Sequence, residues 1–244
     1  MIGDARTALA FLTRLPGGRD LPREGLSGAA AWFPAVGLLV GGVMAATRAL
    51  AGLALDPTPA TVLAIAVVVI VTGGLHEDGL ADTADALGAH TGRGRKLEIL
   101  RDPRVGTFGA LALILAVALQ VALLAPLDDA HFARAALAGH VLARWSILPQ
   151  SRVLPAARPD GAGTLVRATT PTIAVGSCTA IATALLAGGL RPGGIALATA
   201  STLTALGGYT ALRAIGGVTG DTFGAVTKLV ELGVYAALAA AWSS

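Results

Sequence analysis

Long apolar segments separated by charged connections constrain the fold of this chain more than any other feature. The segment ATVLAIAVVVIVT, at residues 60–72, contains no charged side chain. About 20 mostly apolar residues let a helix cross a membrane, where every backbone polar group needs an internal partner. Segments of this kind lie at roughly 29–55, 58–75, 107–126, 131–149, 172–190, 193–210 and 225–242. The sequence therefore predicts an all-α polytopic membrane helix bundle of about seven spans.

The composition supports a single integral membrane domain over residues 1–244. Hydrophobic residues make up 54% of the chain and charged residues 14%, whereas soluble domains carry about 25% charged residues. The 32 glycines suit membrane helices, whose backbones approach closely through small residues. Residues 1–28 are charged and lack a long apolar run, so we expect no cleavable signal peptide. The single cysteine, Cys178, excludes a disulfide within the chain.

The distribution of Lys and Arg predicts how the bundle is oriented. Cations are concentrated in the N-terminal stretch and in residues 76–106, 150–171 and 211–224, whereas the alternate connections carry only Arg191. Connections rich in Lys and Arg stay on the cytoplasmic side of a membrane. We therefore expect the N-terminus and these three connections to face the cytoplasm and the C-terminus to face outward. The inner, or cell, membrane is the predicted location.

An acidic stretch, GGLHEDGLADTADALGAH at residues 73–90, follows the second apolar segment. Asp78, Asp82 and Asp85 are spaced i, i+4 and i+7, so on a helix their carboxylates share one face, with Glu77 beside them. Neighbouring carboxylates repel each other, and a divalent cation would compensate them. Mg²⁺ suits such a stripe because it binds through few carboxylates together with water and substrate phosphates.

The acidic stripe has alternative interpretations. It could be a solvated acidic face of a cytoplasmic connection, or it could mark a pathway for cations. Its position at the membrane boundary, where carboxylates are costly and usually functional, favours a site. His76, at the start of the stretch, is either a ligand or base, or a polar residue with its hydrogen bonds satisfied.

Cations follow the acidic stretch in RGRKLEILRDPRVGTFGA, at residues 92–110. Guanidinium groups bind phosphate in a bidentate manner, so Arg101 and Arg104, on either side of Asp102, are candidate ligands for substrate phosphate. Arg14, beside a proline in the N-terminal stretch, is a third candidate or a lipid anchor. Anchoring to anionic lipid is the preferred interpretation of three further cations: Arg93, Arg95 and Lys96.

Two further acids are candidates in the last apolar segment and just before it. Asp221, in GDTFGA, is either a fourth metal ligand beside Glu77, Asp78 and Asp82 or the cap of the helix that follows. Glu231 lies two turns inside the last segment, where an ionisable residue is either functional or paired with a cation. Its candidate partners are Arg144 and Lys228.

Several motifs resemble the cobalamin synthase family, whose members are adenosylcobinamide-GDP ribazoletransferases, also called cobalamin-5′-phosphate synthases. The resemblance rests on LHEDGLADTADALG, EILRDPRVGTFGALAL and GGVTGDTFGA, and it extends to AFLTRLP, FPAVGLLVG and ARW. It therefore runs over almost the whole chain. The family more often has a hydrophobic residue at position 77 and an acidic one at position 228, where this chain has Glu77 and Lys228.

The resemblance implies the last assembly step of the nucleotide loop of cobalamin. In this Mg²⁺-dependent, membrane-bound reaction, adenosylcobinamide-GDP is joined to α-ribazole or its 5′-phosphate, and GMP leaves. We expect Asp78 and Asp82 to hold Mg²⁺ against the pyrophosphate and Asp85 to act as the base for the attacking hydroxyl. Arg14, Arg101 and Arg104 would bind phosphate, and Glu77 and Asp221 would complete the metal shell.

Other functions remain as alternatives. A small polytopic transporter could hold a cation on the acidic helix, although its charges would be expected near the bilayer midplane and here they cluster in the connections. A phospholipid synthase would show Asp-Gly-x-x-Ala-Arg, and this chain, with Asp78-Gly79-Leu80-Ala81-Asp82, lacks the Ala-Arg pair. The cations lack interleaved aromatic residues, so a nucleic-acid partner is not expected. The oligomeric state, including a homo-oligomer, stays open.

Overall fold

The computed structural model describes residues 2–15 and 25–243, and every regular element in these ranges is a helix. Eight of the described helices are long, with 14 residues or more: α3 (Phe33–Ala51), α4 (Pro57–Thr72), α5 (Leu75–Gly88), α7 (Thr107–Leu124), α8 (Asp129–Trp145), α11 (Thr170–Gly188), α12 (Leu190–Ile215) and α13 (Gly220–Trp242). The other helices are α1 (Ile2–Leu12), α2 (Ser27–Ala30), α6 (Arg93–Ile99), α9 (Ile147–Val153) and α10 (Ala162–Leu165). The predicted all-α bundle is confirmed. Arg19 and Arg23, two of the cations in the N-terminal stretch, lie outside the described residues.

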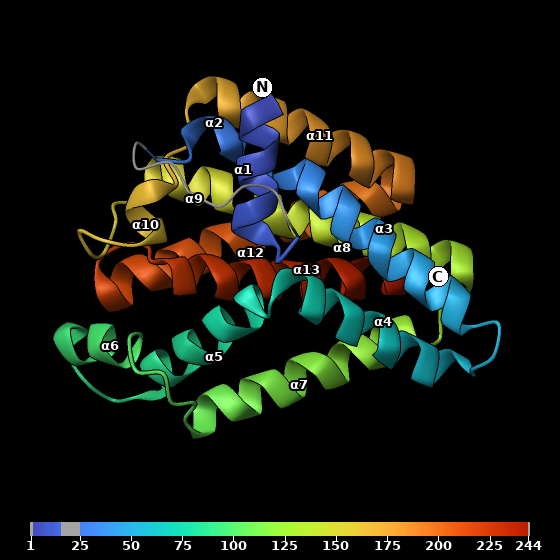
Figure 1. Cartoon of the computed structure of the whole chain (residues 1–244), viewed down its shortest axis with the longest axis horizontal. Helices are drawn as coiled ribbons and strands as arrows, with labels where there is room; N and C mark the ends of the chain where they lie inside the picture. Colours follow the sequence, from blue (N-terminus) through green and yellow to red (C-terminus); the bar gives the residue numbers. More distant parts are fainter. Residues whose placement is uncertain (1, 16–24, 244) are drawn as a thin grey trace.

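The long helices run between two ends of the bundle. The α3–α4 and α7–α8 connections and the C-terminus lie at one end, and α6 and α10 lie at the other (Figure 1). We call the end with α6 and α10 the loop end. It carries the three arginine-rich connections that the sequence predicts to face the cytoplasm.

Five helices are long and apolar enough to cross a membrane, namely α3, α7, α11, α12 and α13. A sixth span results if α4 and α5 are counted together, although they meet at an angle of 89°. Each of the seven predicted segments corresponds to a helix, but the predicted number of about seven spans is not reached. The reason is that α4 is only 16 residues long and α8 is both short, at 17 residues, and polar.

Small residues contribute to the helix contacts at the centre of the bundle, and many large aliphatic side chains face outward. α8 packs against α3, α11 and α13, and its buried residues include Ala135, Ala136 and Gly139. Large side chains such as Ile114 and Leu115 of α7 are instead about two-thirds exposed. Outward-facing apolar side chains are expected for helices surrounded by lipid, where helix association depends on close packing rather than on burying apolar surface.

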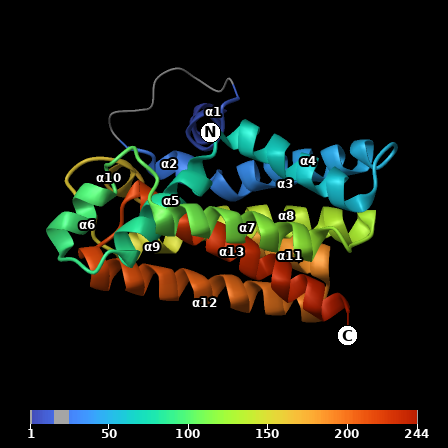
Figure 2. The same cartoon turned by 90° about the horizontal axis from the view of Figure 1, so that it is seen from below.

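The sharp bend between α4 and α5 positions the acidic helix. Gly73 and Gly74 both have a left-handed backbone, with φ of +68° and +69°, which glycine adopts without a steric penalty. The bend directs α5 along α13 and α7 toward the loop end (Figure 2). Gly79 lets α5 approach α13 closely, because a Cβ atom there would lie 2.6 Å from the backbone oxygen of Asp221.

Candidate active site

The acidic stretch forms α5, as predicted, and its three aspartates share one face of that helix. Asp78 is exposed, whereas Asp82 and Asp85 are half-buried. The close approach at Gly79 brings this face to the first turn of α13, which carries Asp221. We call Asp78, Asp82 and Asp221 the acidic cluster.

Asp221 is held in place by an arginine from a distant part of the chain. Arg158 donates from a terminal nitrogen to Asp221 Oδ2 at 2.7 Å, and the hydroxyl of Thr219 lies 3.2 Å from the same oxygen. The cap of α13 is Thr219, which forms a capping box with Thr222. Asp221 is therefore not the cap of α13, and its other carboxylate oxygen has no hydrogen bond among the described residues.

Negative charge accumulates around Asp82. Burial, and after it the negative charges of Asp78, Asp221 and Asp85, raise the pKa of Asp82, and Arg158 lowers it. Like charges this close are costly unless a cation balances them. The acidic cluster thus has a deficit of positive charge that the protein itself does not fill.

Asp85 has a different environment from the rest of the stripe. Its two oxygens accept hydrogen bonds from the backbone N–H groups of Gly106, at 2.7 Å, and Gly109, at 2.9 Å. These groups belong to the N-terminus of α7, where a carboxylate is stabilised by the free N–H groups and the helix dipole. Both oxygens are thus occupied, so this geometry favours a structural role, and the prediction that Asp85 is the base stays untested.

A cavity of about 690 Å³ opens at the α4–α5 bend. Its wall includes Arg14, Gly73, Glu77 and Asp78. The exposed side chain of Arg14 packs on the bend at Gly73, and its backbone N–H donates to Val71 O at 2.7 Å. The cavity therefore presents one guanidinium and one exposed member of the acidic cluster to the same space.

A second, smaller cavity of about 130 Å³ adjoins the acidic cluster. It is lined by both Asp78 and Asp221, together with His76, Phe11 and Phe223. Asp78 therefore lies between two cavities, one with an arginine and one with aromatic walls. His76 is buried, and its Nε2 atom has no partner among the described residues.

The two arginines predicted to bind phosphate are engaged with carboxylates. Arg101 contacts both oxygens of Asp160 at 2.9 and 3.0 Å, and Arg104 forms a bidentate pair with Asp102 at 2.9 and 2.7 Å. The hydrogen bonds from Arg104 lower the pKa of Asp102 to about 2. Both ion pairs are exposed, so water competes with each partner and the pairs are weak. The structure does not place either arginine on the wall of the two cavities.

Glu77 is not free to join the acidic cluster. Lys228 Nζ lies 2.8 Å from Glu77 Oε1 and 2.9 Å from Glu231 Oε1, and all three side chains are largely buried. The predicted role of Glu77 as a metal ligand is thus disfavoured, because its Oε1 atom already balances a buried cation. The predicted pairing of Glu231 with Lys228 is confirmed.

Glu231 is the centre of a buried polar network that joins four helices. Its carboxylate accepts from Gln120 Nε2 of α7 at 2.7 Å and lies 3.1 Å from His140 Nδ1 of α8. Arg144, also on α8 and fully buried, lies 3.9 Å from the same carboxylate. With Lys228 on α13 and Glu77 on α5, this network connects the acidic helix to the centre of the bundle.

The described residues do not form a metal site by themselves. Within residues 2–15 and 25–243, no three His, Cys, Asp or Glu side chains are close enough together to hold a metal ion. A cation bound at the acidic cluster would therefore take the rest of its ligands from water or substrate. This is the usual way in which Mg²⁺ is bound, through one or two carboxylates and the phosphates of a substrate.

Comparison with known proteins identifies the family. The family model described as "Cobalamin-5-phosphate synthase" matches residues 4–239. The chain belongs to the cobalamin-5-phosphate synthase family. Among its relatives are proteins named adenosylcobinamide-GDP ribazoletransferase from Bradyrhizobium diazoefficiens and Chlorobaculum tepidum. The first is 40% identical over 95% of this chain and 91% of the relative, and the second is 39% identical over 99% and 96%.

Family membership helps to decide between the transferase and the transporter. A third relative, from Mesorhizobium japonicum, carries the same transferase name and is 38% identical over the whole of this chain and 95% of its own length. No solved structure matches the chain. The named relatives are enzymes, so the family favours the transferase over the transporter that the sequence analysis left open.

Sequence reasoning missed the residues that connect distant segments. Arg158 was counted only as a cation of a connection, yet it holds Asp221, 63 residues away. Arg93, interpreted as a lipid anchor, donates from Nε to Ile215 O at 2.8 Å and so ties α6 to the end of α12. Neither role has a local signal, because both depend on which helices lie side by side.

Proposed function

We propose that this chain transfers ribazole to adenosylcobinamide-GDP, as the names of its relatives describe, and that the acidic cluster is the reaction centre. The observation that carries the proposal is the concentration of carboxylates around Asp82, beside a cavity that also presents Arg14. A substrate with a pyrophosphate group and a divalent cation is complementary to this combination. The proposed acceptor is α-ribazole or its 5′-phosphate, and the other product is GMP.

The donor set suits Mg²⁺. Asp78, Asp82 and the oxygen of Asp221 that Arg158 leaves free are hard oxygen ligands, and their three negative charges exceed the single positive charge of Arg158. We propose that Asp78 and Asp82 hold the ion and that Asp221 completes the protein part of the site. When bound, the ion would neutralise charge on the pyrophosphate and on the departing GMP. Glu77 is left out of this set because its Oε1 atom pairs with Lys228 and its Oε2 atom is buried.

The protein's own groups position the reaction. A hydroxyl group of α-ribazole attacks the phosphorus next to the corrinoid arm; a new P–O bond forms, the P–O bond to GMP breaks, and the hydroxyl proton is released. Arg14, at the bend, would hold the pyrophosphate by charge-assisted hydrogen bonds. Arg101 and Arg104 would join only by exchanging their present carboxylate partners for phosphate.

The proposed location is the inner, or cell, membrane, with the acidic cluster on the cytoplasmic side. Five apolar helices support a multi-pass membrane protein. The cationic connections and the acidic helix lie toward the same loop end, which supports a cytoplasmic active site under the positive-inside rule. Nucleotide-activated substrates are produced in the cytoplasm, so this orientation would give them direct access.

A reconstituted turnover assay tests the proposed function. Purified protein in lipid vesicles would receive adenosylcobinamide-GDP and either α-ribazole or its 5′-phosphate, with Mg²⁺ or with EDTA, and GMP and the corrinoid product would be quantified. We expect GMP and product in equal amounts with at least one acceptor, and their loss in EDTA with recovery on adding Mg²⁺. Turnover that persists in EDTA would contradict the metal assignment, and no turnover with either acceptor would contradict the reaction.

A further inference from the structure

An apolar groove lies between α9 and α12, on a different side of α13 from the acidic helix. Its volume is about 460 Å³, and its walls include Pro149, Val153 and Leu154 from α9 and its end, and Gly208 and Leu212 from α12. The hydroxyls of Ser201 and Thr204 on its wall donate to carbonyls of their own helix, so they do not make the groove polar. The groove is therefore a hydrocarbon surface.

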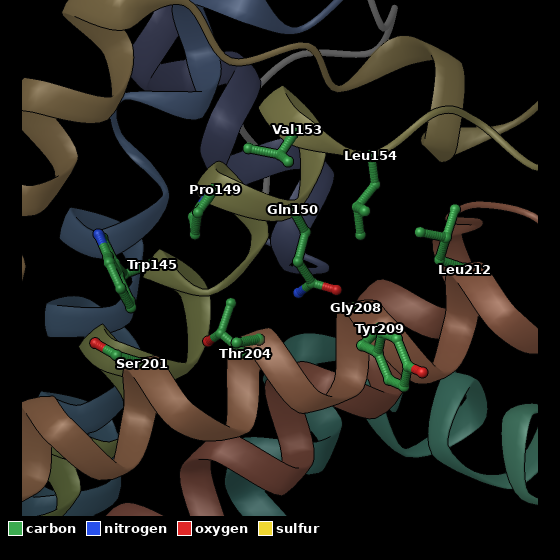
Figure 3. A pocket seen from close by; sticks show the side chains of 11 residues that line it. Trp145, Pro149, Gln150, Val153, Leu154, Ser201, Thr204, Gly208, Tyr209 and Leu212 are labelled. Atoms are coloured by element: carbon green, nitrogen blue, oxygen red, sulfur yellow. The ribbon is translucent and has the colours of Figure 1, made fainter.

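The groove has two distinct ends. Trp145 and Ser201 lie at one end and Leu154 and Leu212 at the other (Figure 3). The stretch of α12 from residue 201 to residue 212 spans about 16 Å at 1.5 Å per residue, which is about half of the ~30 Å hydrocarbon core of a bilayer. Because α12 ends at Ile215, the end with Leu154 and Leu212 is the one near the loop end of the bundle.

Three arginines lie close to the end of the groove that is near the loop end. The exposed Arg167 donates to Leu154 O at 3.2 Å, so its guanidinium lies over a residue that lines the groove. Arg152 and Arg213 directly precede Val153 and directly follow Leu212, and both are exposed. In the part of the chain that the structure describes, none of the three forms an ion pair with a carboxylate. The apolar groove thus has one guanidinium over its end and two further uncompensated arginines next to its lining residues in the chain.

We propose that this groove is a binding site for an anionic phospholipid of the cytoplasmic leaflet. The acyl chain would lie along α12 toward Trp145, and the phosphate would be bound by Arg152, Arg167 and Arg213. The groove length matches one leaflet, and cations near the surface of an anionic leaflet attract its headgroups. The proposal uses none of the residues assigned to the acidic cluster, so it stands independently of the proposed reaction.

Trp145 provides a direct probe because it lies at the far end of the groove, where the acyl chain would end. A variant with Trp32→Phe and Trp242→Phe keeps Trp145 as the single tryptophan of the three in the chain. It would be reconstituted in phosphatidylcholine vesicles with rising fractions of phosphatidylglycerol brominated on the acyl chains, which quench tryptophan fluorescence. A site gives quenching that saturates at a low fraction, whereas random contact gives quenching proportional to the fraction.

We expect brominated phosphatidylglycerol to bind at the groove about fivefold or more tightly than brominated phosphatidylcholine. This is the factor that a single cation near an anionic surface supplies. Replacing Arg152, Arg167 and Arg213 together by Gln should remove the preference. Arg191→Gln, at the opposite end of α12, is the matched control and should leave it unchanged. In 1 M salt the preference should also fall, because charges are then screened within about 3 Å.

Two results would overturn the proposal. One is equal quenching by the two lipids, or a preference that survives the triple variant. The other concerns Gln150, which is buried on the groove wall and whose Oε1 atom has no partner among the described residues. The second result that would overturn the proposal is loss of binding in Gln150→Met, because the occupant would then be a ligand that donates a hydrogen bond to this oxygen. An acyl chain should bind this variant at least as well as the single-tryptophan parent.

Discussion

Lys228 occupies an unusual place for a lysine, since its ammonium group is buried in a membrane helix between two carboxylates. Removing one partner of a buried ion pair costs about 3–5 kcal/mol, whereas replacing both by apolar residues is often close to neutral. Glu231 has further partners in Gln120 and His140, but Oε1 of Glu77 has only Lys228 among the described residues. Glu77 and Lys228 therefore form a unit that can be removed as a pair.

Lys228→Met should destabilise the protein by about 3 kcal/mol or more, because it leaves the buried charge of Glu77 uncompensated. The double variant with Glu77→Leu should recover most of this loss, since Glu231 keeps its partners on α7 and α8. The measurement is the thermal unfolding midpoint in detergent, read together with turnover. If the double variant is less stable than Lys228→Met, the two residues are not a unit.

Asp85 can be tested as a helix cap or as a base. As a cap, Asp85→Asn loses one of two hydrogen bonds to the start of α7 and its interaction with the helix dipole, at a cost of about 1–2 kcal/mol. The unfolding midpoint and the activity should then fall together, and turnover should recover at lower temperature. A loss of 10²-fold or more in kcat with an unchanged unfolding midpoint would instead assign Asp85 as the base.

At the scale of elements, the bend between α4 and α5 is the feature that creates the site. It turns α5 by 89° away from α4 and opens the cavity that Arg14 and Asp78 share. The two glycines of the bend have the same backbone conformation but different neighbours. A Cβ atom on Gly73 would overlap the side chain of Arg14, whereas one on Gly74 would meet only Val69 at 4.0 Å.

This difference makes Gly73→Ala and Gly74→Ala a matched pair. Both place a non-glycine residue in the left-handed region, at a cost of about 1–2 kcal/mol each. Only Gly73→Ala also displaces Arg14, so we expect it to raise the KM for adenosylcobinamide-GDP by about tenfold or more, the value of one hydrogen bond to a charged group. Equal KM values for the two variants would show that Arg14 does not hold the substrate.

At the scale of the whole molecule, the order of helices and connections gives a definite topology. The α3–α4 connection and α6 lie at opposite ends of the bundle (Figure 1). With Cys178→Ser as the parent, Asp56→Cys and Glu98→Cys place one exposed thiol at each end. A membrane-impermeant maleimide applied to intact cells should label position 56 at once and position 98 only after permeabilisation. Labelling of both positions in intact cells would contradict the topology.

The sequence was sufficient to predict what depends on local composition. The apolar segments and the helix that carries the acidic stripe each have a local cause, and both are present in the structure. The number of spans could not be predicted in the same way. α8 has a helix's length but is filled with small and polar residues that face other helices, so its role depends on its neighbours.

The site was predictable only in part, for the same physical reason. Helical spacing placed Asp78, Asp82 and Asp85 on one face, but spacing cannot show that Asp85 meets the start of α7 or that Glu77 meets Lys228. These contacts join residues that are 21 and 151 positions apart (106 − 85 and 228 − 77). They are set by helix packing and not by sequence periodicity.

The most direct test of the acidic cluster as the reaction centre is the kcat of Asp82→Asn beside that of Glu98→Gln. Both changes remove one carboxylate charge with little change in shape, but Glu98 is an exposed residue of α6 paired with Arg95. We expect Asp82→Asn to lower kcat about 10²-fold or more, in line with losing one group that stabilises a transition state, and Glu98→Gln to match the wild type. An Asp82→Asn enzyme with wild-type kcat would show that the reaction takes place elsewhere.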